Sequence, residues 1–241
     1  MITEVSPVRP NARLSLIVWL LPSSRFKVWA LRRLGNCIGR NATLAPNLVL
    51  NCGRFELGDD VFINQLNVFR NLAGVRMGDK AIIGSMNQIT ASPDYQRFSR
   101  YVGLLLIEKL GAITNRHYID CSGQVIIKQY AAIGGVKGIF QSHEIDLAED
   151  KTTVGRVILD EYSISTTAVL MLRDSRLPAR SVLAAGALMA KQRDGSELPV
   201  SQLYAGIPAK PVAPVGGFAW WQRQDHVTAV TPFNDEVFKS C

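Results

Sequence analysis

The first forty residues contain almost no acidic side chain. Glu4 is the single carboxylate there, against seven arginine and lysine residues, so this segment holds +6 of the formal net charge of +7. The rest of the chain is therefore nearly neutral, which argues against a broad nucleic-acid-binding surface. We predict no nucleic-acid partner.

Cysteine and long apolar runs are also scarce. The four cysteines show none of the C-x-x-C spacing of metal or redox sites, and nothing before them resembles a cleavable signal peptide. We therefore expect reduced thiols in a cytoplasmic protein, with Cys52 and Cys121 buried as small hydrophobic residues. The apolar stretch LSLIVWLL (14–21) is too short to span a bilayer.

Residues 9–40 interleave apolar and aromatic side chains with arginine and lysine. The stretch SSRFKVWALRRLG (23–35) begins with serines that can cap a helix and ends at a glycine, so we predict a short helix there. Such a segment can cover the end of a core with its arginines in solvent, or it can lie on an anionic membrane surface. The two roles are compatible, and the second would place the protein peripherally at the inner face of the membrane.

Aliphatic residues recur at intervals of six from residue 38 onward. This period matches neither an α-helix, which repeats every 3.6 residues, nor an alternating strand, which repeats every two. It matches a short strand and a sharp turn, three of which make one triangular coil, and coils must stack because one alone cannot bury its apolar side chains. The predicted inward positions are Ile38, Leu44, Leu50, Leu57, Ile63, Phe69, Met77, Ile83, Ile89, Ile127, Ile133, Ile139, Ile145, Ile158, Ile164, Leu170, Leu177, Leu183 and Met189.

Glycine directly follows several of these aliphatic positions. Examples are LGDD (57–60), MGDK (77–80), IGSM (83–86) and IGGV (133–136). At a corner, glycine removes the side chain that would crowd its surroundings. The sequence therefore predicts a mainly β solenoid with corners at regular intervals.

The hexads and the end of the repeat region together resemble the hexapeptide-repeat acyltransferases, over roughly residues 35–212. The ending contains the rung AGALMAK (185–191), followed by the segment GIPAK (206–210), which matches a G-x-P-A-K pattern. The resemblance implies a left-handed parallel β-helix that uses acetyl-CoA as co-substrate and no metal. It also implies a homotrimer whose active sites lie between neighbouring chains.

We divide the chain into an N-terminal basic helical cap (1–36), the β-helix domain (37–212) and a C-terminal tail (213–241). The repeat breaks at about residues 90–118, where we predict an inserted loop with a short helix around Gln96–Leu110. It breaks again at 144–157, where a charged loop leaves the coil. Insertions project from a solenoid corner and often carry function. In the tail, Trp220 and Trp221 are predicted to cover the end of the solenoid.

The rung before the second break ends at His143. Residues 141–146 read Q-S-H-E-I-D, which is similar to the T-x-x-H-P-x-D exit of sugar and maltose acetyltransferases, and the resemblance implies that His143 is the general base. An acceptor hydroxyl must lose its proton as it attacks the thioester, and imidazole, with an ordinary pKa of about 6.5, is largely unprotonated at cellular pH. His117 is a second candidate, whereas His226 lies outside the repeat.

Polar residues in and around TNRHYIDCSG (114–123) are predicted to bind the acceptor: Asn115, His117 and Asp120, with Ser142 beside the catalytic histidine. Asp120 can accept a hydrogen bond from an acceptor hydroxyl, orient an imidazole, or only cap a turn. For coenzyme A, the resemblance implies small residues along a groove and cations at the phosphates. These are Ser165, Ala185, Gly186, Lys191, Arg193 and Lys210.

The leading interpretation is an acetyl-CoA-dependent O-acetyltransferase acting on a sugar, in surface-polysaccharide biosynthesis or on a lipid-linked precursor. The alternatives are a sugar-nucleotide N-acyltransferase, a serine-type acetyltransferase, whose usual long helical N-terminal domain is not found here, and a non-enzymatic scaffold. A zinc carbonic anhydrase of this fold needs three converging histidines, and only His117 and His143 lie in or near the repeats.

Overall fold

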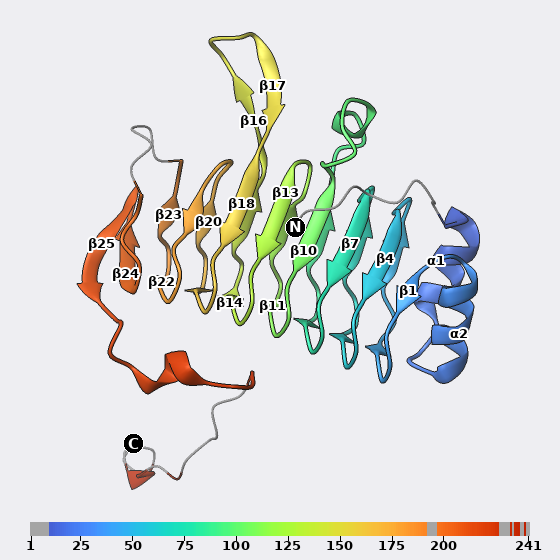
Figure 1. Cartoon of the computed structure of the whole chain (residues 1–241), viewed down its shortest axis with the longest axis horizontal. Coiled ribbons are helices and arrows are strands. Elements are labelled where there is room, and N and C mark those ends of the chain that lie inside the picture. The colour runs from blue at the N-terminus through green and yellow to red at the C-terminus, as the bar shows by residue number, and fades with distance from the viewer. Residues whose placement is uncertain (1–9, 192–196, 227–231, 233, 237–238, 240–241) are drawn as a thin grey trace.

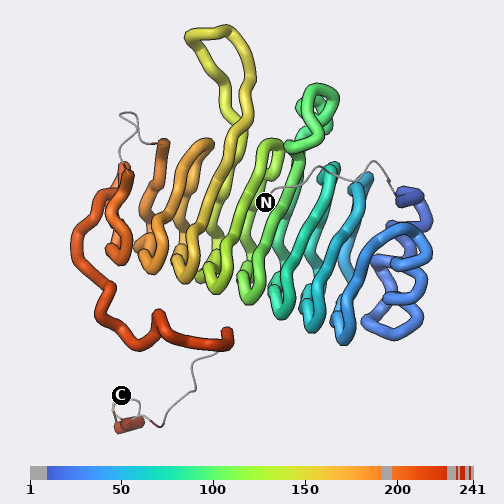
Figure 2. The backbone as a smooth tube through the Cα atoms, viewed as in Figure 1, coloured from blue at the N-terminus to red at the C-terminus, as the bar shows by residue number. Residues whose placement is uncertain are grey.

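The computed structural model describes residues 10–191, 197–226, 232, 234–236 and 239. Over these residues the chain winds into a three-sided solenoid of stacked parallel coils, with two helices at one end (Figures 1 and 2). The predicted parallel β-helix is confirmed. Cys52 and Cys121 are buried, as predicted.

Three sheets form the three faces, and each coil adds one strand to each sheet in turn. Sheet A contains β1 (Cys37–Ile38), β4 (Arg54–Leu57), β7 (Gly74–Met77), β10 (Leu104–Ile107), β13 (Gln124–Ile127), β18 (Arg156–Leu159) and β21 (Arg176–Leu177). Sheet B contains β2 (Thr43–Leu44), β5 (Phe62–Ile63), β8 (Ile82–Ile83), β11 (Ala112–Asn115), β14 (Ala132–Val136), β19 (Ile164–Ser165), β22 (Val182–Leu183), β24 (Gln202–Gly206) and β25 (Ala209–Pro214). Sheet C contains β3 (Leu48–Leu50), β6 (Val68–Arg70), β9 (Gln88–Thr90), β12 (Tyr118–Asp120), β15 (Ile139–Gln141), β20 (Leu170–Met171) and β23 (Leu188–Met189). We name each corner by the sheets it joins, so a B–C corner follows a sheet B strand and a C–A corner follows a sheet C strand.

The core is a stack of side chains from all three sheets, and most of the predicted hexad positions contribute to it. The glycines after Met77 and Ile83 are needed because coils stack closely there: a Cβ on Gly78 would lie 2.5 Å from the Lys109 nitrogen, and one on Gly84 would lie 2.5 Å from the Thr114 oxygen. Glycine at these corners therefore avoids a steric clash with the next coil, as predicted.

The predicted register is wrong at six positions. In five of them the true core residue is the direct neighbour: Val49, Phe140, Leu159, Ser165 and Met171 are buried instead of Leu50, Ile139, Ile158, Ile164 and Leu170. The sixth, Ile145, is 68% exposed on a hairpin. The β14 corner explains the shift at Phe140, because it contains an irregularity that lengthens the spacing from Ile133 to the next core residue.

The first predicted break in the repeat, at about residues 90–118, contains most of a complete coil that the sequence analysis did not predict. The predicted helix over Gln96–Leu110 is wrong: a single 3₁₀ turn, η1 (Tyr95–Arg97), is followed by β10, β11 and β12 in register with the coils on both sides. The excursion spans only residues 91–103. Ile107, Ile113 and Ile119 continue the six-residue period in this coil and are buried.

Two helices cap the first coil, α1 (Ala12–Leu20) and α2 (Arg25–Arg33). Ser24 caps α2, as the serines of the sequence predicted. The side chain of Lys27 fixes the cap to the solenoid, because its buried Nζ donates to the carbonyl oxygens of Trp19 at 2.7 Å, Leu21 at 2.8 Å and Ala45 at 2.8 Å. Burial lowers the pKa of Lys27 to about 8. Neither helix is long and apolar enough to cross a membrane, within the described residues.

The C-terminal part ends the solenoid differently from the prediction. The strand β25 pairs antiparallel with β24 at the outer edge of sheet B. The chain then returns beneath the solenoid through η2 (Ala219–Gln222), as Figure 1 shows. Trp220 stacks on Arg223, which in turn donates a 2.5 Å hydrogen bond to the carbonyl oxygen of Tyr130. The tryptophan pair therefore lies along the side of the coils, and the predicted role as an end cap is wrong.

Candidate active site

Both excursions from the solenoid leave from C–A corners. The segment 91–103 follows β9, and the hairpin of β16 (His143–Asp146) and β17 (Lys151–Val154) follows β15. Figure 1 shows both on the same side of the solenoid. The coil between them turns tightly at residues 121–123, directly after Asp120, so this residue and His143 meet at one edge.

His143 and Asp120 form a hydrogen-bonded dyad. The distance from His143 Nδ1 to Asp120 Oδ2 is 2.7 Å, and the side chains are 38% and 7% exposed, respectively. An ionised carboxylate only accepts hydrogen bonds, so Nδ1 carries the proton and donates it. Nε2 is then left with a lone pair that can take a proton from a bound molecule.

Two serines hold the carboxylate in place. Asp120 Oδ2 accepts from the backbone nitrogen of Ser142 at 3.0 Å and from its hydroxyl at 3.1 Å. Oδ1 accepts from the hydroxyl of Ser122 at 2.5 Å and from its backbone nitrogen at 3.2 Å. With the imidazole, the buried carboxylate has five donors, so its orientation is fixed by the backbone on both sides.

The corner of the middle coil leaves no space for a side chain. A Cβ on Gly123 would lie 2.0 Å from the Gly155 oxygen at the base of the hairpin. The Gly123 nitrogen donates to Ser142 Oγ at 2.9 Å, which ties the middle coil to the dyad. On the other side, the Ser92 nitrogen donates to Ser122 Oγ at 2.9 Å, so the 91–103 segment is connected to the same network.

Sequence analysis missed several residues that surround the dyad. The ring of Tyr95, from the 91–103 segment, lies 6.3 Å from that of His143, centroid to centroid. Glu144, next to the dyad histidine, is ion-paired with Arg173, which also contacts Asp174 at 2.9 Å. The D-x-S spacing of residues 120–122 was a usable signal for Ser122, whereas Tyr95 and Arg173 approach only through folding.

Known structures share this architecture. AntD, an N-acyltransferase from Bacillus cereus solved as a mutant with dTDP and coenzyme A, has a TM-score of 0.52 and 11% identity, covering 82% of this chain and 93% of AntD. The chain has the left-handed β-helix fold of the hexapeptide-repeat acyltransferases. The hexapeptide-repeat acetyltransferase VCA0836 from Vibrio cholerae O1 biovar eltor, complexed with acetyl coenzyme A, has a TM-score of 0.45 and 15% identity, covering 84% of each chain. No protein-family model and no curated protein sequence matches the chain.

His117 lies at a different corner from His143, within a ladder of buried amides. In the B–C corners, the backbone nitrogen of Asn67 donates to Asn47 Oδ1, that of Asn87 to Asn67 Oδ1 and that of His117 to Asn87 Oδ1, at 2.8–2.9 Å. His117 Nδ1 then accepts from the Gly138 nitrogen at 3.0 Å, and Nε2 lies 2.9 Å from Thr114 Oγ1.

Both ring nitrogens of His117 are thus engaged by the protein. Its side chain is buried, and burial lowers its pKa to about 4, so the ring is neutral at cellular pH. This placement contradicts the predicted acceptor-binding role and the second candidacy as base. Asn115 also lies at the B–C corner, where its Oδ1 accepts from the Ser85 nitrogen at 2.6 Å, away from the dyad. His226 contacts the Lys80 carbonyl oxygen instead.

The predicted coenzyme A residues are divided between two corners. Ala185 and Gly186 are exposed at a B–C corner, and a Cβ on Gly186 would meet no described residue within 4 Å. Lys191 is exposed after β23, at a C–A corner, and Lys210 is exposed on β25. Ser165 is wrong as a groove residue because its side chain faces the core. Arg193 lies outside the described residues.

No group of three or more histidine, cysteine, aspartate or glutamate side chains that could hold a metal occurs in the described part of the chain.

Proposed function

We propose that the protein is an acetyl-CoA-dependent acetyltransferase that acetylates a hydroxyl of a sugar, with His143 as general base. The observation that carries the proposal is the dyad: a half-exposed imidazole whose Nδ1 is held by a buried carboxylate, on a solenoid of the acyltransferase fold. A solenoid that served only as a scaffold would not need a carboxylate with five donors behind an exposed imidazole.

In the proposed reaction, the acceptor oxygen attacks the thioester carbonyl carbon while its proton passes to His143 Nε2. The carbon–sulfur bond then breaks, and the thiolate of coenzyme A takes the proton back from the imidazolium. Asp120 stabilises the imidazolium and fixes its orientation. Since the thioester already has a good leaving group, no covalent enzyme intermediate is needed.

The acceptor is proposed to lie between the two excursions at the C–A corner. Tyr95 offers an aromatic ring beside the imidazole, and flat apolar sugar faces stack on such rings. The similarity of residues 141–146 to the exit loop of sugar acetyltransferases supports the same acceptor class. Its setting would be the biosynthesis of a surface polysaccharide or its lipid-linked precursor.

Coenzyme A would bind as a co-substrate. Gly186 and Ala185 leave an uncrowded corner, and Lys191 and Lys210 offer exposed cations for phosphates. Because Lys191 and the small residues lie at different corners of one chain, we propose that neighbouring copies complete each site, as in a homotrimer.

The outer face of sheet C supports such an assembly. Its strands place a mainly apolar row in register along the solenoid, and Tyr118 and Ile139 within that row are 46% and 40% exposed. The row consists of Leu48, Val68, Gln88, Tyr118, Ile139, Leu170 and Leu188. Light scattering checks the assembly, and a monomeric mass at micromolar concentration would contradict it.

A second candidate is N-acylation of an amino sugar carried on a nucleotide. The likeness to AntD, an N-acyltransferase solved with dTDP and coenzyme A, favours this alternative. The two candidates share the dyad and differ in the nucleophile. An amine that is neutral when bound needs less help from a base than a hydroxyl does.

The test is thiol release from acetyl-CoA with a panel of monosaccharides, lipid-linked sugars, amino-sugar nucleotides and serine. We expect release to depend on a sugar hydroxyl, with a mass gain of one acetyl group on the product and loss of that group in mild alkali, as for an ester. An alkali-stable product on an amino sugar would establish the second candidate instead. Release with serine alone, or with no acceptor in the panel, would overturn the proposal.

A further inference from the structure

The helical cap leaves large apolar side chains in solvent at the end of the solenoid. On α1, Leu14 is 52% exposed, Ile17 59% and Leu20 50%; on α2, Phe26 is 60% exposed and Trp29 54%. The rings of Phe26 and Trp29 stack on each other at 5.8 Å between centroids. These positions recur three residues apart, so each helix presents an apolar stripe on its exposed side.

The exposure of these residues does not reflect a loosely attached cap. The opposite sides of both helices are fixed, because Trp19 and Leu31 are fully buried and the ring of Trp19 lies 4.7 Å from that of Phe55. The Nζ of Lys27 joins the C-terminal carbonyls of α1 to the first coil. The cap is therefore a fixed platform whose outer side remains apolar.

The same end of the molecule is strongly cationic. No aspartate or glutamate occurs between residues 10 and 55. Arg13, Arg25 and Arg33 are exposed and have no carboxylate partner among the described residues, and the Arg33 guanidinium lies 5.6 Å from the centre of the Trp29 ring. Exposed apolar residues flanked by unpaired arginines match a surface with a negative outer layer and a hydrocarbon interior.

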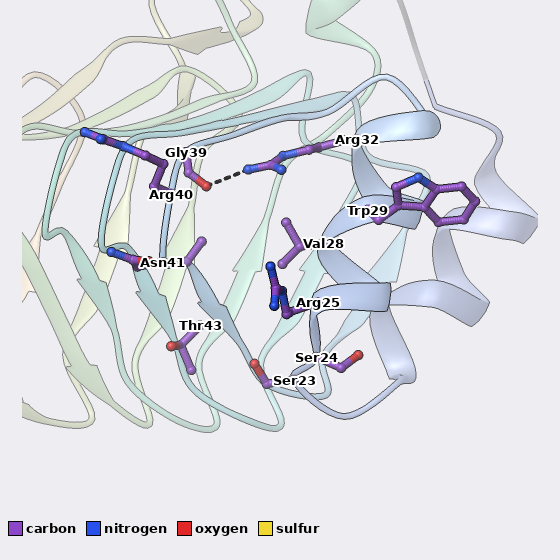
Figure 3. Close-up of a pocket in the computed structure, with 11 residues that line it drawn as sticks. Ser23, Ser24, Arg25, Val28, Trp29, Arg32, Gly39, Arg40, Asn41 and Thr43 are labelled. Carbon is purple, nitrogen blue, oxygen red and sulfur yellow. Dashed lines mark hydrogen bonds between the residues drawn. The ribbon is translucent and has the colours of Figure 1, made fainter.

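A hollow between α2 and the first coil adds hydrogen-bond donors to this surface. It has a volume of about 600 Å³, and Figure 3 shows Ser23, Arg25 and Arg32 on one side and Arg40 and Thr43 on the other. Arg32 donates to the carbonyl oxygens of Ile38 and Gly39, and Arg40 pairs with Asp59. Arg25 has no such partner in the part of the chain that the structure describes. Hydroxyl and guanidinium donors together suit a phosphate group.

We propose that the helical cap docks on an anionic phospholipid bilayer. The apolar stripes enter the headgroup boundary, and the arginines meet lipid phosphates, with one phosphate in the hollow lined by Arg25. The solenoid axis then points away from the membrane, which leaves the dyad edge open to acceptors. The proposal does not depend on acetyl transfer, because the docking surface and the dyad share no residue.

The test is flotation of the full chain with vesicles of one part phosphatidylglycerol to two parts phosphatidylcholine, and with phosphatidylcholine alone. We expect binding to the first only, weakened by added salt. The double variant Arg25→Gln/Arg33→Gln should bind about 25-fold more weakly, since each basic residue near an anionic surface contributes roughly fivefold. Phe26→Ser/Trp29→Ser should lose binding as well.

Matched controls are Arg180→Gln and Phe98→Ser, which change an exposed arginine and an exposed phenylalanine far from the cap in sequence. All four proteins should keep the wild-type unfolding temperature, because each residue is exposed. Equal binding to both vesicle types, equal losses in the control variants, or a chain that self-associates through the cap without floating would overturn the proposal. So would a preference for nucleic acid in competition.

Discussion

Two histidines one coil apart show how the same solenoid builds structure at one corner and chemistry at another. His117 ends an unbroken ladder of asparagines at the B–C corner, where every polar atom of its ring has a protein partner. His143 stands at the C–A corner, where two excursions interrupt the stack, and among the described residues only its Nδ1 has a hydrogen-bond partner. The two histidines differ because their corners differ in regularity. In an uninterrupted corner the polar side chains form hydrogen bonds with neighbouring coils, whereas an interrupted corner leaves some polar atoms for a ligand.

The largest difference should appear in turnover. His143→Ala removes the proposed base, so kcat should fall by about 10²- to 10⁴-fold while coenzyme A still binds. Initial rates of thiol release and calorimetric titration with coenzyme A measure the two quantities. The matched control is His117→Asn, which should keep its activity within a few-fold. If both variants were equally impaired, the division of roles between the corners would be wrong.

The second prediction concerns acid stability. The unfolded histidine titrates near pH 6.5 and buried His117 at about 4, so between these values the unfolded state binds more protons and the free energy of unfolding falls as pH falls. The loss should reach about 3 kcal/mol by pH 4 and be absent above 6.5. His117→Asn keeps an acceptor for the Gly138 nitrogen and should remove this loss, as urea unfolding at pH 7.5 and 4.5 would measure. An unchanged pH dependence would show that this ring is not the titrating group.

Asp120→Asn should have an intermediate effect on rate. A hydrogen bond to a charged group contributes about 1.5–3 kcal/mol, which corresponds to roughly tenfold to a hundredfold in kcat. Because an amide can donate to Nδ1 and so place the proton on Nε2, the pH profile of kcat/KM should shift as well as its height. Asp94→Asn, an exposed carboxylate on the 91–103 segment, is the control. A lower rate with an unshifted profile would indicate a structural role only.

The smallest effect should come from Tyr95. If its ring supports the acceptor, Tyr95→Ala should raise the KM of the sugar by about three- to tenfold, since an aromatic contact contributes about 0.5–1.5 kcal/mol. The KM of acetyl-CoA should stay constant. Phe98→Ala, which removes an 89% exposed ring on the same segment, should change neither constant. Parallel changes in both KM values would place Tyr95 outside the acceptor site.

Much of the fold could be predicted because the core residue repeats at a fixed interval, as with Met77, Ile83 and Ile89. The coil of β10 to β12 could not be predicted from the sequence, because its first strand is buried on both faces. Leu104 is only 1% exposed, and Gln124 on the next strand donates to the Tyr101 carbonyl oxygen, so the 91–103 segment covers sheet A here. A strand buried on both faces loses its alternation, and the run GLLLIEKL then fits a helix as well as a strand.

The sequence could identify site residues that lie at the end of a rung. It could not identify contacts that form only when two coils stack on each other. His143 and Ser142 end a rung, so the sequence pointed to them directly, and Asp120 was named although its partner was left open. The pairing of Asp120 with His143 depends on coil stacking across 23 positions. His117 remained a second candidate in the sequence, because residue types alone do not distinguish a ladder that uses both ring nitrogens from a pocket that leaves one unused.

The two ends of the solenoid differ in the side chains that fill their cores. The first coils enclose Trp19, Phe55 and Phe69 in mutual contact, whereas Ser163, Ser165 and Ser175 in the later coils are buried with hydroxyls that lack a partner among the described residues. In a one-dimensional stack each coil is supported only by its neighbours, so we expect local opening to begin in the serine-containing coils rather than in the aromatic ones. The dyad lies between the two, and the coils on its aromatic side should hold it in place.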